Sequence, residues 1–538
     1  MSKETCFLTV LFFFIFPFNN MMASPGIIPV PQTYRQKGGE FVFNPKTTII
    51  LQPDNQAMRN AVSLLKELFL SASDYELEIK TGKVSRNAVI CQIDNKIAGD
   101  EAYKLDISRD KITVRASTSI GIFYALQSIR QLLPPEINGT KKTTDMKWSV
   151  PCMTVSDAPV FGYRGMMLDV CRHFMPKEFV MRFIDMLAFH KLNTFHWHLT
   201  DDQGWRIEIK KYPKLTEVGA FRRMEIDGHK NAPDWKWKVK DHGGYYTQDE
   251  IREVIAYAKK RFVNIIPEIE LPGHALAALS AYPDLSCSGG PFEVVGRWGV
   301  FHDIYCTREE TMVFLENVLD EVAALFPGEY IHLGGDEAPK TRWKRCKACQ
   351  DRMKTEGIAD ETQLQAYVTG RMEKFLQTRG KKVICWDDAV EAEVSKTITI
   401  MSWRSEDGGI QGVKRGNQVI MTPHKSVYFD YYQGDRKTEP LTIGGFLPLE
   451  KVYAYSPVPE ELTKEQAALI KGTQANIWTE YMPDEKHVEY MVFPRIAALA
   501  EVSWSVRTNK NYEDFISRLG TIIKHYDILE INYRKLTN

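Results

Sequence analysis

Neither sign of charge predominates in this sequence. Lys plus Arg and Asp plus Glu both total 69 among 538 residues, so the formal net charge is zero. Such a chain has no overall electric field that would draw it to nucleic acid or to an anionic membrane. We therefore expect no nucleic-acid partner, and a neutral ligand fits this charge balance. The hydrophobic share of 44% is ordinary for a globular protein and argues against extensive disorder.

Long hydrophobic runs are also scarce. One lies near the N-terminus, over residues 7–18, between Lys3 and the small-residue site Met21-Met22-Ala23. This pattern predicts a secretory signal over residues 1–23, with cleavage before Ser24. A membrane anchor is the alternative, but the run is shorter than the ~20 apolar residues of a spanning helix. We expect export to the periplasm or the extracellular space, and no stable membrane span.

Cysteine is sparse. One of the nine cysteines, Cys6, lies in the predicted signal and leaves eight in the mature chain. An oxidising compartment would permit disulfides, such as Cys287 with Cys306 or Cys346 with Cys349. Cys346-Lys-Ala-Cys349 also resembles half of a zinc site or a redox motif, but no second close Cys or His pair accompanies it. We therefore favour a structural role in a loop, and we predict neither a metal nor a cofactor.

Residues 24–157 have the pattern of a small α+β domain. Runs of alternating polarity, such as residues 103–107 and 111–115, predict strands. Residues 57–69 and 121–133 carry apolar side chains at helical spacing and predict two helices. Pro134-Pro135 and Ser156-Asp-Ala-Pro159 mark the end of this domain.

Residues 158–538 alternate between strand-like and helix-like runs and predict an α/β fold, a (β/α)8 TIM barrel with a C-terminal helix. Helix starts support this pattern. Thr247 to Glu250 and Thr307 to Glu310 fit the capping box, and Pro176 stands in the first turn of a helix over 176–192. The eight strand-like runs are Tyr163–Val170, Thr194–Leu199, Val263–Ile269, Tyr330–Gly334, Lys382–Trp386, Thr397–Trp403, Gln418–Thr422 and Gly472–Trp478.

Carboxylates and aromatic residues follow these strands, at the end of the barrel where active sites form. Neither a nucleophilic Ser or Cys nor a phosphate-binding glycine loop is among them. This composition suits a sugar, because aromatic faces cover its C–H surface while charged groups bind its hydroxyls. The residues are Arg172, His173, Asp201, Asp202, Glu268, Glu270, His274, Asp336, Glu337, Trp386, Asp387, Trp403, Tyr428, Asp430, Trp478 and Glu480.

The sharpest signal is Asp336-Glu337, which follows a strand through Gly334-Gly335. Neighbouring carboxylates disfavour joint ionisation, so one of them can keep a proton near neutral pH and act as an acid. A retaining glycosidase of the usual kind places its acid and nucleophile on separate segments, about 5 Å apart. Two consecutive residues do not easily flank a sugar. Another group, such as the substrate itself, is therefore expected to supply the nucleophile.

Long stretches of the chain match one known family in consistent order. They are Gly121-Ile-Phe-Tyr-Ala-Leu-Gln127, Tyr163-Arg-Gly-Met-Met-Leu-Asp-Val-Cys-Arg-His-Phe174, Phe195-His-Trp-His-Leu-Thr-Asp-Asp-Gln-Gly-Trp205, Pro267-Glu-Ile-Glu-Leu-Pro-Gly-His274, His332-Leu-Gly-Gly-Asp-Glu337 and Ala475-Asn-Ile-Trp-Thr-Glu480. On these stretches the chain resembles glycoside hydrolase family 20, the β-N-acetylhexosaminidases. The resemblance implies an exo-acting hydrolase that removes terminal non-reducing β-linked N-acetylhexosamine, GlcNAc or GalNAc, from glycans or glycoconjugates.

The resemblance also implies catalytic roles. The 2-acetamido oxygen of the substrate attacks the anomeric carbon and gives an oxazolinium intermediate. Glu337 protonates the leaving oxygen and later activates water, while Asp336 orients the acetamido N–H and stabilises the developing positive charge. Tyr428 resembles the phenol that binds the acetamido oxygen. Asp201 and His274 resemble a polar pair behind the acid.

Other residues at the strand ends resemble sugar-binding positions of the family, although each has a purely structural alternative. Trp386 and Trp403 also fit core aromatic residues, and an isolated His274 also fits a structural histidine. Three tryptophans resemble walls around the acetamido methyl group and three charged residues resemble hydroxyl-binding groups: Trp386, Trp403, Trp478, Arg172, Asp430 and Glu480. Asp202, Glu268 and Glu270 are expected to support the site.

Two other functions fit parts of the sequence. A relative that releases a disaccharide such as lacto-N-biose would need a longer, open pocket. A carbohydrate-binding protein on a decayed hydrolase barrel is the alternative from another class. The intact Asp336-Glu337 pair weighs against that alternative, because binding alone does not require a general acid.

Overall fold

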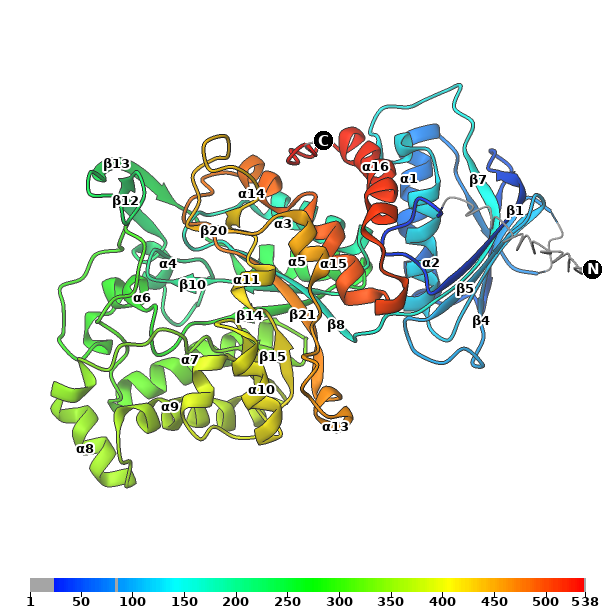
Figure 1. Ribbon diagram of the computed structural model, residues 1–538. Coiled ribbons are helices and arrows are strands. Elements are labelled where there is room, and N and C mark those ends of the chain that lie inside the picture. Colours follow the sequence, from blue (N-terminus) through cyan, green and yellow to red (C-terminus); the bar gives the residue numbers. More distant parts are fainter. Residues whose placement is uncertain (1–23, 83–85, 537–538) are drawn as a thin grey trace, which may run out of the picture.

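A computed structural model describes residues 24–82 and 86–536 and places them in two parts (Figure 1). The first part is an α+β domain, and the second is a closed barrel of eight parallel strands with helices around it. This architecture confirms the predicted fold class. The predicted signal over residues 1–23 lies outside the described residues. Among the described residues, no helix combines the length and the apolar character needed to cross a membrane.

The N-terminal domain is one seven-stranded sheet with two helices on one face. The strands follow the order β1-β7-β5-β6-β4-β2-β3. Helices α1 and α2 lie side by side on the face turned toward the barrel (Figure 1). Thr118 caps α2, because its side chain accepts from the backbone N–H groups of Ile120 and Gly121. The bounds are β1 Thr33–Val42, β2 Thr48–Gln52, α1 Gln56–Ser73, β3 Glu78–Lys80, β4 Ala88–Ile93, β5 Tyr103–Ile107, β6 Lys111–Ala116, α2 Ser119–Leu132 and β7 Ser149–Asp157.

The barrel contains all eight predicted strands, and every neighbouring pair is parallel. Every residue of β8 and β9 is buried, as expected for strands of a parallel barrel whose two faces are both covered. Around the closed barrel the order is β14-β15-β16-β17-β18-β21-β8-β9. The bounds are β8 Tyr163–Asp169, β9 Thr194–His198, β14 Asn264–Glu268, β15 Tyr330–His332, β16 Lys382–Trp386, β17 Thr399–Ser402, β18 Val419–Met421 and β21 Ile470–Ile477.

Helices cover the outside of the barrel. The predicted capping box at the start of α5 is present, with Thr247 and Glu250 satisfying each other's backbone N–H groups. Pro176 is the N-cap of α3 and precedes its first turn. The main helices are α3 Lys177–Phe189, α5 Gln248–Lys260, α7 Glu309–Leu325, α8 Lys347–Glu356, α9 Glu361–Gln377, α10 Glu406–Arg415, α14 Glu485–Val492, α15 Arg495–Trp504 and α16 Tyr512–Ile528.

The second predicted capping box is wrong. Helix α7 begins at Glu309 with Arg308 as its N-cap, and no side chain caps it. The guanidinium group of Arg308 donates to the carbonyl oxygens of Asp284 and Ser286, which fixes the backbone just before the helix. Thr307 is buried, and its hydroxyl has no hydrogen-bond partner among the described residues. The start of α7 is thus set by tertiary contacts instead of the local motif.

A buried ion pair fastens the N-terminal domain to the barrel. Lys191 Nζ lies 3.3 Å from Asp157 Oδ2, and neither side chain is exposed. Tyr103 donates its hydroxyl to the same carboxylate at 2.7 Å, and Trp504 donates its indole N–H at 2.9 Å. Because a buried charge is costly unless paired and hydrogen-bonded, these four side chains depend on one another.

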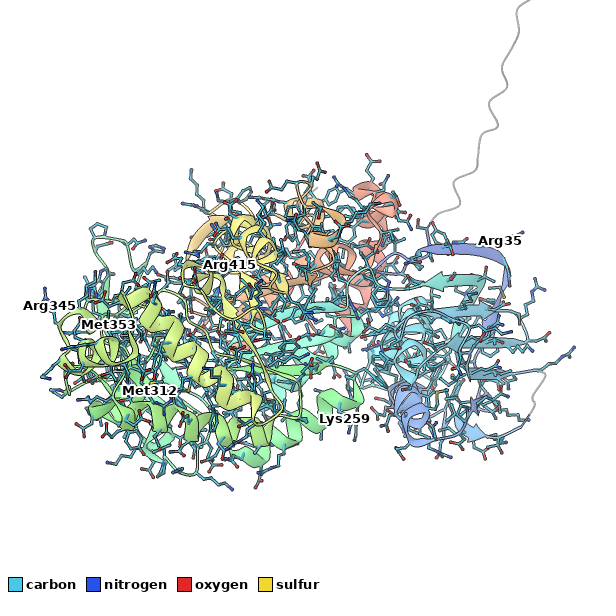
Figure 2. All side chains as sticks on the ribbon, turned by 90° about the horizontal axis from the view of Figure 1, so that it is seen from below. Arg35, Lys259, Met312, Arg345, Met353 and Arg415 are labelled. Atoms are coloured by element: carbon cyan, nitrogen blue, oxygen red, sulfur yellow. The ribbon has the colours of Figure 1, made fainter. Side chains whose placement is uncertain are left out.

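The two ends of the described chain also meet. Arg518 of α16 donates to the carbonyl oxygen of Ile27 at 2.9 Å and to Glu501 at 2.5 Å. Glu501 in turn accepts from the backbone N–H of Val30 at 2.8 Å. Helix α16 lies against the N-terminal helices (Figure 1), whereas α8 lies at the opposite end of the molecule, where Figure 2 labels Arg345 and Met353. The last helix therefore joins the two parts of the structure.

Candidate active site

All eight barrel strands deliver predicted site residues to the same end of the barrel. Short strands β10, Thr200–Asp201, and β11, Gly204–Trp205, form a hairpin just after β9 and carry Asp201. The assignments by preceding strand are Arg172 after β8, Asp201 after β9, His274 after β14, Asp336 and Glu337 after β15, Trp386 at the end of β16, Trp403 after β17, Tyr428 and Asp430 after β18, and Trp478 and Glu480 after β21.

A left-handed turn after β15 separates the two consecutive acids. Gly334 and Gly335 have φ values of 63° and 97°, and Glu337 itself has a φ of 45°. A Cβ atom on Gly334 would lie 1.7 Å from Glu270 Oε2, so both the backbone conformation and the space require glycine there. Asp336 is buried, whereas the side chain of Glu337 is 43% exposed. Two neighbours in sequence thus occupy different environments.

Burial gives Asp336 the properties of a weak acid. Burial is the main cause, and together with the negative charges of Asp388 and Glu337 it raises the pKa of Asp336 to about 7 against the opposing effect of His274. Asp336 Oδ1 has no hydrogen-bond partner among the described residues. Asp388, which sequence reasoning missed, accepts from the backbone N–H of Glu337 at 3.3 Å and from the indole of Trp403 at 2.9 Å. Asp388 therefore helps to position the turn, and its negative charge contributes to the raised pKa of Asp336.

His274 lies between the acid turn and two buried carboxyl groups. Its Nε2 is 3.7 Å from Asp336 Oδ2 and 3.8 Å from Glu337 Oε2. Its Nδ1 is 3.0 Å from Asp202 Oδ2 and 3.3 Å from Asp201 Oδ1. Burial opposes a charged His274, but the charge of Asp201 and the hydrogen bonds of both carboxylates hold its pKa well above the usual range. The structure thus adds Asp202 to the predicted pair of Asp201 and His274.

The residues predicted to bind hydroxyls lie on the opposite side of the barrel mouth. Arg172 Nη2 contacts Asp201 Oδ2 at 2.8 Å, and its guanidinium carbon lies 5.0 Å from the centre of the Trp478 ring. Burial raises the pKa values of Asp430 and Glu480, and Arg172 partly offsets this effect. One oxygen of each carboxyl group is buried without a hydrogen-bond partner among the described residues. A polar ligand would satisfy these oxygens.

Four aromatic rings form one wall of the site. Tyr428 lies nearly parallel to Trp403, with ring centres 6.3 Å apart, and its centre is 6.4 Å from that of Trp478. Trp386 is 6.0 Å from Trp478 and only 1% exposed, so it packs in the barrel interior behind the more open rings. Burial holds the pKa of Tyr428 well above its usual range, so its hydroxyl keeps its proton. The wall combines apolar faces with a hydrogen-bond donor.

A buried carboxylate, Glu268, and three histidines lie beneath the site. From the sequence, Glu268 is expected only to support the site, and the histidines have no predicted role. Glu268 Oε2 is 2.5 Å from His198 Nδ1 and 3.0 Å from His196 Nε2, and its Oε1 is 2.8 Å from His332 Nδ1. His198 Nε2 continues to Asp201 at 3.0 Å. The sequence did contain one signal for this cluster. His196 and His198 are two residues apart in β9, and residues two apart in a strand face the same side.

The histidines of this cluster differ in charge. Burial lowers the pKa of His196 to about 4, so this ring is neutral. Burial also opposes the charged form of His198, but the negative charge of Glu268 and the hydrogen bonds to Asp201 and Glu268 raise its pKa to about 10. His198 thus carries the positive charge between Glu268 and Asp201. The side chains of this cluster lie close enough together to hold a cation, and so do Asp201, Asp202 and His274. In both groups, however, the side chains already form ion pairs with one another.

Comparisons with known proteins converge on one family. The profile described as glycosyl hydrolase family 20, catalytic domain, matches residues 161–507, and that described as glycosyl hydrolase family 20, domain 2, matches residues 24–158. A β-hexosaminidase from Porphyromonas gingivalis is 42% identical over 94% of this chain, and the chain spans 64% of that protein's length. A β-hexosaminidase from Vibrio furnissii is 37% identical, with coverage of 89% of this chain and 76% of the relative.

Solved structures agree with these sequence matches. The GH20 exo-β-N-acetylglucosaminidase from Vibrio harveyi, in complex with N-acetylglucosamine, has a TM-score of 0.83 and 34% identity, covering 95% of this chain and 78% of that one. The GH20 β-N-acetylhexosaminidase from Streptomyces coelicolor has a TM-score of 0.83 and 27% identity, covering 96% and 99% of the two chains.

The turn before the two acids generates a stability prediction. Gly334→Ala should destabilise the protein by clearly more than the ~1–2 kcal/mol expected for a left-handed alanine, because the new methyl group meets Glu270. Gly380→Ala is the matched control, since Gly380 has a φ of 71° but a Cβ atom added to it would meet no other atom within 4 Å. Chemical denaturation of both variants measures the difference. Equal destabilisation would mean that close contact at Gly334 contributes nothing.

Proposed function

Because the chain belongs to glycosyl hydrolase family 20, we propose that it is an exo-acting glycosidase that removes terminal non-reducing β-linked N-acetylhexosamine. The observation that carries this proposal is the pairing of a buried Asp336 with an exposed Glu337 at one strand end, opposite an aromatic wall. The substrates would be glycans or glycoconjugates that end in GlcNAc or GalNAc.

In the proposed reaction the substrate supplies the nucleophile. Its 2-acetamido oxygen attacks the anomeric carbon, the bond to the leaving oxygen breaks, and Glu337 donates a proton to that oxygen. The resulting oxazolinium carries a positive charge, which an ionised Asp336 stabilises while it accepts from the acetamido N–H. Water then attacks the anomeric carbon and gives up a proton to Glu337, while the bond from that carbon to the acetamido oxygen breaks and the acetamido group is restored. The sugar is released with its original β configuration, and the enzyme returns to its starting state.

The surrounding residues would hold the terminal sugar in place. Tyr428 would donate to the acetamido oxygen, and Trp386, Trp403 and Trp478 would surround the acetamido methyl group. Arg172, Asp430 and Glu480 would bind the ring hydroxyls, which fits the unpartnered oxygens of the two carboxyl groups. Asp201 and His274 would hold the acid turn from behind. Each part of this arrangement favours a neutral, amide-bearing sugar.

We also propose that the secretory signal over residues 1–23 directs export to the periplasm or the extracellular space, where the glycan substrates would be encountered. The lysine before the apolar run and the small residue before Ser24 support this proposal. N-terminal sequencing of the chain recovered from an expressing cell tests it, and an unprocessed chain retained in the cytoplasm would contradict it.

Glu337→Gln should lower the turnover of natural glycosides by about 10²–10⁴-fold, because the amide cannot protonate the leaving oxygen. An aryl glycoside with an acidic leaving group should lose much less in its first step. Steady-state and single-turnover rates on both substrates measure this difference, with the exposed Glu393→Gln as the control. An equal loss on both substrates, with the second step shown not to limit either rate, would contradict the acid role.

Asp336→Asn should lower turnover by about 10²–10³-fold, because an amide cannot neutralise the oxazolinium charge. It should not lower the melting temperature, because it removes a buried carboxyl group whose ionised form is disfavoured. A substrate with a plain 2-hydroxyl should be nearly inert, and a thiazoline that mimics the cyclised intermediate should inhibit strongly. Intact-protein mass spectrometry with a slow 2-fluoro glycoside and with the 2-acetamido substrate tests the nucleophile. A stable sugar ester on either carboxylate would refute substrate assistance.

The pKa of Asp336 predicts a pH dependence. Because the proposed role needs ionised Asp336, kcat/KM should fall as the pH drops through about 7. Asp388→Asn removes a negative neighbour, so it should lower the pKa of Asp336 and move this acid limb to lower pH. The variant keeps an oxygen that can accept from Trp403. The exposed Asp407→Asn should not move the limb, and a shift of the Asp388 variant toward higher pH would oppose the prediction.

A further inference from the structure

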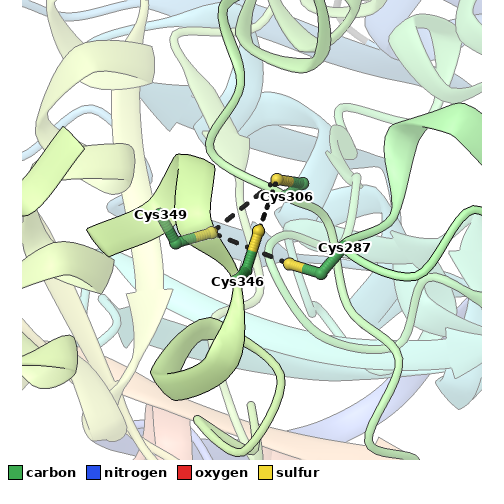
Figure 3. A group of neighbouring side chains, drawn as sticks. All are labelled: Cys287, Cys306, Cys346 and Cys349. Carbon is green, nitrogen blue, oxygen red and sulfur yellow. Dashed lines mark hydrogen bonds between the residues drawn. The ribbon is translucent and has the colours of Figure 1, made fainter. Parts of the chain in front are cut away.

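Four cysteines from two segments of the chain meet beside α8, at the end of the molecule that lies farthest from the N-terminal domain (Figure 1). Cys287 follows the 3-10 turn η2, Pro283–Leu285, and Cys306 precedes α7. Cys346 is the N-cap of α8, and Cys349 lies in the first turn of that helix. Figure 3 shows that their sulfur atoms converge on one point between the segments. None of the four forms a disulfide.

The sulfur atoms are spaced as the corners of a tetrahedron. Cys306 Sγ lies 3.7 Å from Cys346 Sγ and 3.7 Å from Cys349 Sγ, and Cys287 Sγ lies 3.7 Å from Cys349 Sγ. All four ligand atoms are within 4.8 Å of one another. Four thiolates at the ~2.3 Å Zn–S distance of a tetrahedral site would stand about 3.8 Å apart. Slight contraction of the longer separations would therefore complete the coordination geometry.

We propose that Cys287, Cys306, Cys346 and Cys349 bind one Zn²⁺ ion as a closed, structural site of four thiolates. Each thiol loses its proton on binding, so four protons are released and the complex carries a net charge of −2. All four positions are filled by protein, which leaves no place for water or substrate on the metal. The site is thus distinct from the chemistry of Asp336 and Glu337.

The surroundings of the cluster favour thiolates. Cys346 caps α8, a ten-residue helix whose first N–H groups receive no side-chain cap, and such a helix end stabilises negative charge. Thr307 lies beside Cys349, close enough for its hydroxyl and its backbone to stabilise a thiolate there. Arg342 lies within electrostatic range of Cys287. Basic residues crowd this part of the chain, from Lys340 to Lys347.

Disulfides explain the geometry less well. Cys306 is equally distant from Cys346 and Cys349, so no pairing is preferred. The pairings suggested from the sequence, Cys287 with Cys306 and Cys346 with Cys349, are not formed. In the sequence, Cys346-Lys-Ala-Cys349 resembles half of a zinc site, but a structural role is favoured there because no second close pair accompanies the motif. The fold supplies two further cysteines, which lie 59 and 40 residues before Cys346 and 19 residues from each other.

The proposed zinc would join two loops that carry active-site residues. Cys287 and Cys306 belong to the segment that follows His274, and Cys346 and Cys349 follow Glu337. The same loops are already linked by Trp343, whose indole donates to the carbonyl of Tyr305 at 2.8 Å, and by Arg342 with Asp303 at 2.8 Å. A metal at this point would hold the loop of the proposed acid against the loop of His274.

Elemental analysis of the purified full chain tests the site without reference to activity. We expect about one zinc per chain, falling to below about a tenth in the Cys346→Ser, Cys349→Ser double variant. Cys152→Ser, which removes a single buried cysteine of β7, is the matched control and should keep its zinc. X-ray absorption at the zinc edge of the wild-type protein should show four sulfur neighbours at about 2.3 Å.

A count of free thiols in the wild-type protein tests the zinc site even if the double variant does not fold. After denaturation with a chelator and without reductant, all four cysteines of the cluster should be alkylated in peptide mapping. Alkylation-resistant pairs joined as disulfides, or four free thiols in a native protein that contains no zinc, would overturn the proposal. Zinc with nitrogen or oxygen neighbours in its absorption spectrum would also place the metal elsewhere.

Discussion

Asp336 and Glu337 are covalent neighbours, yet one carboxyl group is buried and the other reaches the surface. The turn that holds them has positive φ at Gly334, Gly335 and Glu337. Glycine at 334 also lets Glu270 approach, and the backbone N–H of Gly335 lies 3.4 Å from Glu270 Oε2. His274 and Asp388 contact this turn from two sides and so help to hold its conformation. His274 itself has a φ of 48°. Such strain persists only where the surroundings fix it.

The charged groups behind the turn are paired with one another, whereas several carboxyl groups at the front have oxygens without a partner among the described residues. Behind the site, His198 is held between Glu268 and Asp201, and Arg172 between Asp201 and Asp169. These buried charges are paired, as a low-dielectric interior requires. In front, single oxygens of Asp336, Asp430 and Glu480 have no partner among the described residues. The interior network thus fixes the positions of groups whose remaining hydrogen-bonding capacity faces the barrel mouth.

The sequence was sufficient for the barrel and for most residues at its mouth, because each strand is marked by a short apolar run followed by polar residues. The sequence was insufficient for residues whose contact partners are distant in the chain. Glu268 and its histidines required the barrel to close, and Asp388 required β15 and β16 to lie together. Thr307 fitted a local capping motif that tertiary contacts of Arg308 overrode. The four cysteines form a cluster only after two segments distant in the chain have folded together, so their spacing along the chain concealed them.

The contact of α16 with the N-terminal domain has a consequence for the order of events during synthesis. The ribosome makes this helix after the barrel, yet Arg518 and His525 on it bind Ile27 and Asn138, which belong to a part made before the barrel. The N-terminal domain must therefore wait for more than 350 residues of barrel before its final contacts exist. Until then its barrel-facing surface is open to chaperones, proteases and wrong partners. A chain cut short before α16 would be left in that unfinished condition, however complete its catalytic residues.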